Sequence, residues 1–143
     1  MDRDVTPVQA LQKALAAEHA AVYLYGILGA RSSSSEQPVL FARLQQAYAD
    51  HRDARDGLVA LLARREVDPV ASQTDYELPG PVGTPDEVQA VARTVERRVT
   101  DTYGELVANT AGDDRRLAVA ALATSAVREL GFGGAPVDLP GLG

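Results

Sequence analysis

Hydrophobic residues recur along the chain at alternating spacings of three and four, the period of an amphipathic helix. The first seam consists of Val8, Leu11, Leu15, Glu18, Val22 and Tyr25. The second consists of Leu40, Leu44, Ala47, His51, Ala54, Leu58 and Leu61. Two further periodic segments follow, and together the pattern predicts helices over residues 7–30, 37–66, 85–111 and 114–130.

Turn and cap residues mark the ends of these segments. Thr6-Pro7-Val8-Gln9 predicts a helix start with Thr6 as N-cap, Pro7 at the first helical position and Gln9 closing a capping box. Thr84-Pro85-Asp86-Glu87 repeats that pattern. For the fourth helix we expect Asp113 or Asp114 to be the N-cap and Gly131 to end the helix.

The connection between the second and third helices, residues 67–83, is rich in Pro and Gly and has no helical period. A connector of this length can run the full height of a bundle, so that the third helix is parallel to the second. The pattern therefore predicts an all-α, up-down-down-up four-helix bundle formed by residues 1–143 as a single domain. We expect the tail, residues 131–143, to lie against the bundle through Phe132, Val137 and Leu139.

The amino-acid composition limits which kinds of functional site the chain can form. The chain has 143 residues, no Cys and two His. Disulfides, thiolate metal sites and cysteine nucleophiles are therefore excluded, and a metal site has to be rich in carboxylates. The formal net charge of −6 argues against a nucleic-acid partner. The sequence contains no basic, apolar leader and no apolar run near the ~20 residues that span a bilayer, so we expect a cytoplasmic protein without membrane segments.

The first and third helical segments share a pattern with a constant offset. Glu18 and Glu96, Tyr25 and Tyr103, and Thr6 and Thr84 are each 78 residues apart. Such regularity predicts a duplicated helical hairpin, the alternative being coincidence between two amphipathic helices.

Three polar residues interrupt the apolar seams: Glu18, His51 and Glu96. Each lies about halfway along its helix, and at ~1.5 Å rise per residue the midpoints of antiparallel helices meet at one depth. We therefore expect these side chains to converge in the interior. His19 points about 100° away from Glu18 around the helix, which predicts a surface or interface position.

These features resemble the ferritin-like superfamily, whose di-iron members take a Glu from helices one and three and a Glu-x-x-His pair from helices two and four. Glu18, Glu96 and His51 match three of these six ligands. Tyr48 stands where the helix-two Glu is expected, and residues 117–125 contain neither Glu nor His. The Ala-Glu-His-Ala-Ala-Val-Tyr segment, the Tyr-x-x-His-Arg segment and the Pro-rich crossover are similar to a bacterial ferritin-like domain family of unknown function, with an incomplete di-metal site.

Three interpretations follow for the centre. The first is a buried hydrogen-bond network of Glu18, His51 and Glu96 with Tyr25, Tyr48 or Tyr103, in place of a functional di-iron centre. The second is one Fe, Mn or Zn ion on Glu18, His51 and Glu96, as a metal-binding protein or oxidoreductase; an Arg at the centre, from Arg97 or Arg98, weakens it. The third is a small-molecule or partner-binding cavity opened by the small residues of helix four.

No nucleophile elbow, phosphate-binding loop or dinucleotide fingerprint is present, so the sequence predicts no catalytic or cofactor-binding residues and favours a protein that is not an enzyme. The Ala-rich fourth helix is the candidate surface for a homodimer.

Overall fold

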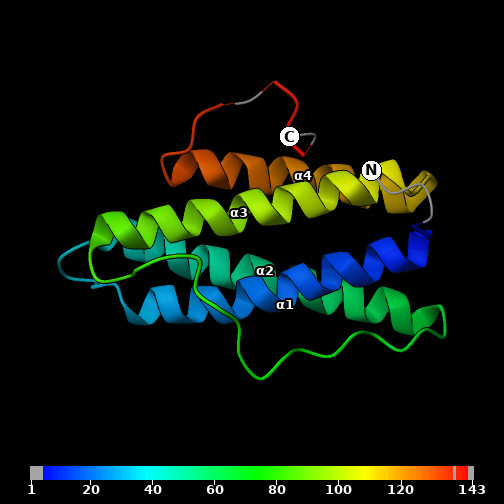
Figure 1. Cartoon of the computed structure of the whole chain (residues 1–143), viewed down its shortest axis with the longest axis horizontal. Coiled ribbons are helices and arrows are strands. Elements are labelled where there is room, and N and C mark those ends of the chain that lie inside the picture. Colours follow the sequence, from blue (N-terminus) through cyan, green and yellow to red (C-terminus); the bar gives the residue numbers. More distant parts are fainter. Residues whose placement is uncertain (1–4, 137, 142–143) are drawn as a thin grey trace.

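The computed structural model describes residues 5–136 and 138–141. Within these residues the chain forms four α-helices and no strand: α1 (Pro7–Ala30), α2 (Pro38–Arg64), α3 (Pro85–Ala108) and α4 (Gly112–Gly131). Figure 1 shows α1 and α2 running in opposite directions, α3 running in the direction of α2, and α4 returning along α3. The prediction of an all-α, up-down-down-up bundle is confirmed.

Local sequence explains how the long helices begin. The Thr6 hydroxyl accepts from the Gln9 backbone N–H, and the Gln9 side chain accepts from the Thr6 backbone N–H, which completes the capping box. Thr84 accepts from the Glu87 backbone N–H in the same way. These caps satisfy N–H groups that the first turn of a helix leaves without partners.

The start of α4 differs from the expectation. The N-cap is Ala111 rather than Asp113 or Asp114, and no side chain caps the helix. Gly112, at φ 60°, makes a tight turn directly after α3, so the helix starts before the aspartates. Asp113 and Asp114 lie in the first turn instead, where negative charge is favourable near the helix N-terminus.

The crossover runs back along the bundle from the end of α2 to the start of α3 (Figure 1). Side chains of α1 hold its first part: Gln12 donates to the Asp68 carbonyl and accepts from the Val70 N–H, each at 2.8 Å. His19 is partly buried and its Nε2 lies 2.9 Å from the Val70 carbonyl oxygen. His19 therefore binds to the crossover and takes no part in the centre of the bundle.

Packing among the four helices is uneven. α1 packs against α2 and α3, and α3 packs against α4, whereas contacts between α2 and α4 are few. In α4 only Ala118 and Ser125 are fully buried. At the end of the second seam Leu62 is buried rather than Leu61, because the position four residues after Leu58 faces the core there.

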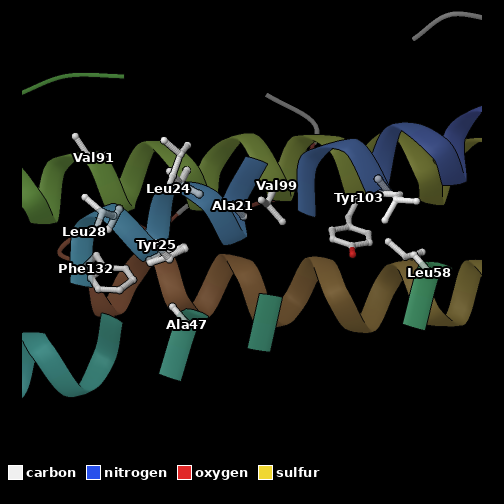
Figure 2. Close-up of a cluster of buried hydrophobic side chains, with 14 of the residues drawn as sticks. Ala21, Leu24, Tyr25, Leu28, Ala47, Leu58, Val91, Val99, Tyr103 and Phe132 are labelled. Carbon is white, nitrogen blue, oxygen red and sulfur yellow. The ribbon is translucent and has the colours of Figure 1, made fainter. Parts of the chain in front are cut away.

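The tail begins with Phe132, which is buried beside Tyr25 (Figure 2). Leu139 was expected to pack on the bundle, but 68% of its surface is exposed. Val137 lies outside the described residues. The tail is therefore held at its start by the aromatic ring that directly follows α4, and near its end by the Gly141 backbone, which packs against Gly104 of α3.

No helix within the described residues combines the length and hydrophobicity that crossing a membrane requires.

Candidate functional site

The three polar residues of the apolar seams meet in the interior. His51 Nδ1 lies 2.6 Å from Glu18 Oε2, and His51 Nε2 lies 2.8 Å from Glu96 Oε2. All three side chains are at most 2% exposed. The imidazole of α2 therefore joins a carboxylate of α1 to a carboxylate of α3.

Tyr25 and Tyr103, which are 78 residues apart, each bond to the glutamate of the other helix. Tyr103 donates its hydroxyl to Glu18 Oε1 at 2.8 Å, and Tyr25 donates to Glu96 Oε2. Because α1 and α3 run in opposite directions, a residue seven positions after Glu18 lies opposite Glu96, and the reverse also holds. In Figure 2 Tyr25 and Tyr103 lie apart along the bundle, and both rings are inside it.

Tyr48 does not belong to this network. Its hydroxyl has no hydrogen-bond partner within the part of the chain that the structure describes, and the Arg52 guanidinium lies 5.9 Å from the centre of its ring. The ring is only partly buried. Tyr48 stands one turn before His51, but its ring lies beside Gly26 of α1 and makes no hydrogen bond to Glu18 or Glu96.

α4 supplies two members that the sequence did not identify. Ser125 donates to Glu96 Oε1 at 2.8 Å, and Arg128 donates to the same oxygen at 2.9 Å. A second nitrogen of Arg128 donates to Asp50 Oδ2 at 2.9 Å. Neither Arg97 nor Arg98 takes this position, since Arg97 pairs with Glu129 instead. The three-residue spacing of Ser125 and Arg128, one turn apart on α4, is the signal that was available.

Hydrogen-bond geometry assigns the charges at the centre. Both nitrogens of His51 face carboxylate oxygens, so both carry protons and the ring is an imidazolium. Arg128 Nη1 lies 3.3 Å from His51 Nε2, an unfavourable approach of two cations that Glu96 offsets by bonding to both. Asp50, Glu18 and Glu96 oppose these two cations, so the cluster carries three carboxylates and two positive groups.

The pKa values agree with this assignment. Burial lowers the pKa of His51, but hydrogen bonds and negative charge from Glu18 and Glu96 outweigh burial and raise it from 6.5 to about 9. Burial raises the pKa of Glu96, but His51, Arg128 and Tyr25 outweigh burial and lower it from 4.5 to about 2. Burial, followed by the charge of the neighbouring carboxylates, raises the pKa of Tyr25 and of Tyr103, so both hydroxyls stay protonated donors.

As they lie, these residues do not fit a metal ion. A histidine ligand presents a lone pair to the metal, and here both His51 nitrogens are occupied by carboxylates. Arg128 holds the Glu96 oxygen that faces α4. Among residues 5–136 and 138–141 no group of three or more His, Asp or Glu is arranged to hold a metal ion. Positive side chains of the protein itself balance the central carboxylates.

A pocket of about 230 Å³ lies beside the network, between α2 and α4. Its polar lining comes from the network and its neighbours: Glu18, Asp50, His51, Tyr103, Thr124, Ser125 and Arg128. Its apolar lining consists of Ala54, Val99, Ala120 and Ala121. The few contacts between α2 and α4 and the small side chains of α4 explain why space remains here.

Comparison with known proteins yields a family and a fold but no activity. The chain is similar to the crystal structure of a conserved hypothetical protein, rv2844, from Mycobacterium tuberculosis, at 30% sequence identity and a TM-score of 0.83. The match covers 92% of this chain and 97% of the other. No curated protein matches. Residues 10–143 match the domain of unknown function DUF4439, and the chain therefore belongs to the DUF4439 family.

Proposed function

We propose that this protein is a ferritin-like bundle in which a charged hydrogen-bond network takes the place of a di-metal centre and has a structural role. One observation carries the proposal: His51 donates from both ring nitrogens to Glu18 and Glu96, where a metal ligand would offer a lone pair. The bundle topology and the two equivalent carboxylates on α1 and α3 support the ferritin-like part of the proposal.

The network joins all four helices. α1 contributes Glu18 and Tyr25, α3 contributes Glu96 and Tyr103, α2 contributes His51, and α4 contributes Ser125 and Arg128. Each hydrogen bond forms only when the two helices that it joins are in one particular axial register. A slip of one residue moves a side chain by ~1.5 Å along the helix axis and ~100° around it. We infer that the network specifies helix register, as polar groups in apolar helix interfaces do elsewhere.

Oxidation chemistry of the di-iron kind does not follow from this arrangement. Two metals need bridging carboxylates and open positions for substrate. Here the donors of His51, Tyr25, Ser125 and Arg128 all converge on Glu96. In this proposal the protein is a non-catalytic member of the ferritin-like superfamily and acts in the cytoplasm.

Metal analysis tests the proposal. Protein expressed with added iron, manganese and zinc and purified without chelator is expected to contain far less than one metal ion per chain. Its unfolding midpoint in urea is expected to be unchanged by EDTA, because nothing in the folded state depends on a bound cation. About one metal ion per chain, absent from Glu18→Ala, overturns the structural role and favours the mononuclear alternative.

A further inference from the structure

The side of α4 that faces away from the other helices is apolar. Residues that recur at spacings of three and four form this surface, the outer stripe of α4: Val119, Ala120, Ala123, Ala126, Val127 and Leu130. Val119 is 50% exposed, Val127 67% and Leu130 43%. Single exposed hydrophobic residues are ordinary, but a continuous stripe over about three turns indicates a surface that another molecule covers.

The described part of the chain leaves the outer stripe uncovered. Figure 1 shows α4 at the outer edge of the bundle, next to α3, and its contacts with α2 are few. The tail runs along another side of α4, since Gly134 lies beside Glu129. Gly141 lies beside Leu122 of α4 and Gly104 of α3. Whatever covers the outer stripe therefore comes from outside these residues.

The outer stripe is symmetric about Ala123. Val119 and Val127 lie four residues on either side of it, and Ala120 and Ala126 lie three residues on either side. A two-fold interface requires a surface that is complementary to its own copy. When a second α4 runs antiparallel to the first, with Ala123 on the two-fold axis, Val119 of each copy faces Val127 of the other. The alanines between them are small enough to let the two helices approach closely.

The acidic start of α4 lies on the side of the helix that faces α2. Asp113, Ala120 and Thr124 share one side, at spacings of seven and four, and Ala120 and Thr124 line the pocket between α2 and α4. Within the chain Asp113 pairs only with Arg116, and their side chains are 93% and 80% exposed. Such an exposed pair contributes little to stability, so Asp113 can take another partner at small cost.

A cation without a carboxylate partner lies at the other end of α4. Arg43 of α2 donates to the Gly131 carbonyl at 2.7 Å and forms no ion pair within the part of the chain that the structure describes. A two-fold axis perpendicular to the helices keeps the α2 sides of both copies on one side of the interface. Antiparallel alignment then brings Asp113 of each copy to Arg43 of the other, so that opposite charges meet at both ends.

We propose that the outer stripe of α4 is the interface of a two-fold symmetric homodimer. The two α4 helices pack antiparallel about Ala123, and Asp113 of each copy pairs with Arg43 of the other. The second copy also covers Ala120 and Thr124 at the edge of the pocket beside the network. The inference goes beyond the structural role of the network and does not depend on it, so that metal analysis and dimerisation can fail separately.

Sedimentation equilibrium of the full chain over a wide range of protein concentration tests the proposal, and a reversible monomer–dimer equilibrium is expected. Ala123→Glu places two like charges at the two-fold axis and is expected to leave only monomer at concentrations at which the unmodified chain is a dimer. The matched control Ala16→Glu adds the same charge at an exposed position of α1 and is expected to leave the equilibrium unchanged. Circular dichroism checks that each variant folds.

Cysteine cross-linking tests the antiparallel register, because the chain has no Cys of its own. Ala123→Cys lies opposite its own copy and is expected to form an intermolecular disulfide on mild oxidation, whereas Ala16→Cys is expected to stay monomeric. Val119→Cys and Val127→Cys are expected to cross-link when the two variants are mixed and not when each is oxidised alone. Each of these positions is displaced from its own copy by ~12 Å along the axis, which is too far for a disulfide.

Charge exchange tests the ends of the interface. Asp113→Arg alone or Arg43→Asp alone places like charges together at both ends and is expected to weaken dimerisation roughly tenfold. The two substitutions combined in one chain are expected to restore it.

Four outcomes overturn the inference. They are a chain that is monomeric at every concentration, a dimer that Ala123→Glu leaves intact, disulfides that form as readily in Val119→Cys alone as in the mixture, and a charge-exchanged double variant that dimerises as weakly as the single variants.

Discussion

The two hairpins of the bundle, α1–α2 and α3–α4, contribute differently to its centre. Their first helices, α1 and α3, form a matched pair with the same residue types, whereas their second helices, α2 and α4, form an unmatched pair with different ones. α1 and α3 each provide a Glu and, seven residues later, a Tyr, and each Tyr bonds to the Glu of the other helix. α2 provides an imidazolium, whereas α4 provides a hydroxyl and a guanidinium. The matched pair holds the two buried carboxylates, and the unmatched pair supplies two cations together with a third, partly exposed carboxylate, Asp50 of α2.

This comparison separates two physical requirements. A buried carboxylate needs donors and nearby positive charge, because burial alone costs several kcal/mol. The geometry of the donors can vary, since Glu18 obtains its bonds from a Tyr and a His, while Glu96 obtains them from a Tyr, a His, a Ser and an Arg. The side around Glu96 is the more fully satisfied, and the open pocket lies on the side of Glu18.

The largest expected effect comes from removing the group that both halves share. His51→Ala leaves Glu18 and Glu96 buried without the cation between them, and we expect a loss of about 3–5 kcal/mol in the free energy of unfolding. Urea unfolding followed by circular dichroism measures it. His19→Ala is the matched control and is expected to cost at most ~1 kcal/mol, since it removes one partly exposed bond to the crossover. Equal losses in the two variants contradict a central role for His51.

The next prediction compares the stability lost when Glu96 is replaced with that lost when Glu18 is replaced. Glu96 accepts from four side chains and Glu18 from two, so Glu96→Gln is expected to destabilise the fold by roughly 1–3 kcal/mol more than Glu18→Gln. Glutamine keeps the shape and removes the charge. Paired urea denaturation curves provide the difference, and a larger loss for Glu18→Gln means that the two sides have been ranked wrongly.

Stability is expected to depend on pH on both sides of a maximum. The pKa of His51 is about 9 in the fold against 6.5 unfolded, so the folded state holds the extra proton and its stability decreases as pH rises from about 6.5 to 9. The pKa of Glu96 is about 2 against 4.5, so stability decreases as pH falls from about 4.5 toward 2. The maximum therefore lies between about 4.5 and 6.5, and each slope is at most ~1.4 kcal/mol per pH unit for one proton.

Unfolding free energies measured across this range in one ionic-strength-matched buffer series test the prediction. His51→Gln, where it folds, is expected to lose the decrease on the alkaline side, because the titrating group is gone. An alkaline slope that persists in His51→Gln assigns the titration to another residue.

The last prediction separates the tyrosines of the network from the one outside it, where the smallest effect is expected. Tyr25→Phe and Tyr103→Phe each remove one hydroxyl that donates to a buried carboxylate, and we expect losses of about 1.5–3 kcal/mol. Tyr48→Phe is expected to lie within ~0.5 kcal/mol of the unmodified protein, because its hydroxyl has no partner among the described residues. A cost at Tyr48 equal to that at Tyr103 contradicts the assignment of network members.

Local patterns in the sequence were sufficient for the elements and for part of the centre. The Thr-Pro starts led directly to the observed starts of α1 and α3, because capping depends on residues only three positions apart. Glu18, His51 and Glu96 were identifiable because a polar residue at a seam position stands out against the apolar period. The start of α4 was misplaced because a left-handed Gly112 allows a helix to begin without a side-chain cap.

Arg128 is a residue of the centre that local sequence patterns could not identify. In sequence it is an arginine in the last turn of a helix, a position common on protein surfaces because positive charge is favourable there. Tertiary packing turns it inward: Ser125 is small, α2 and α4 stand apart, and the long side chain reaches Glu96 and Asp50 through the space between them. Tyr48, in contrast, has a suitable spacing from His51, but its ring lies beside Gly26 of α1 and does not reach the carboxylates.

The sequence by itself determined the four helices, their order and directions, and the three seam residues at mid-height, because periodicity, caps and connector length act over short distances along the chain. Only the tertiary structure decided which cations balance the carboxylates and where a pocket remains. Those outcomes depend on distances between helices and on the reach of side chains from different helices, and a pattern within one helix contains neither.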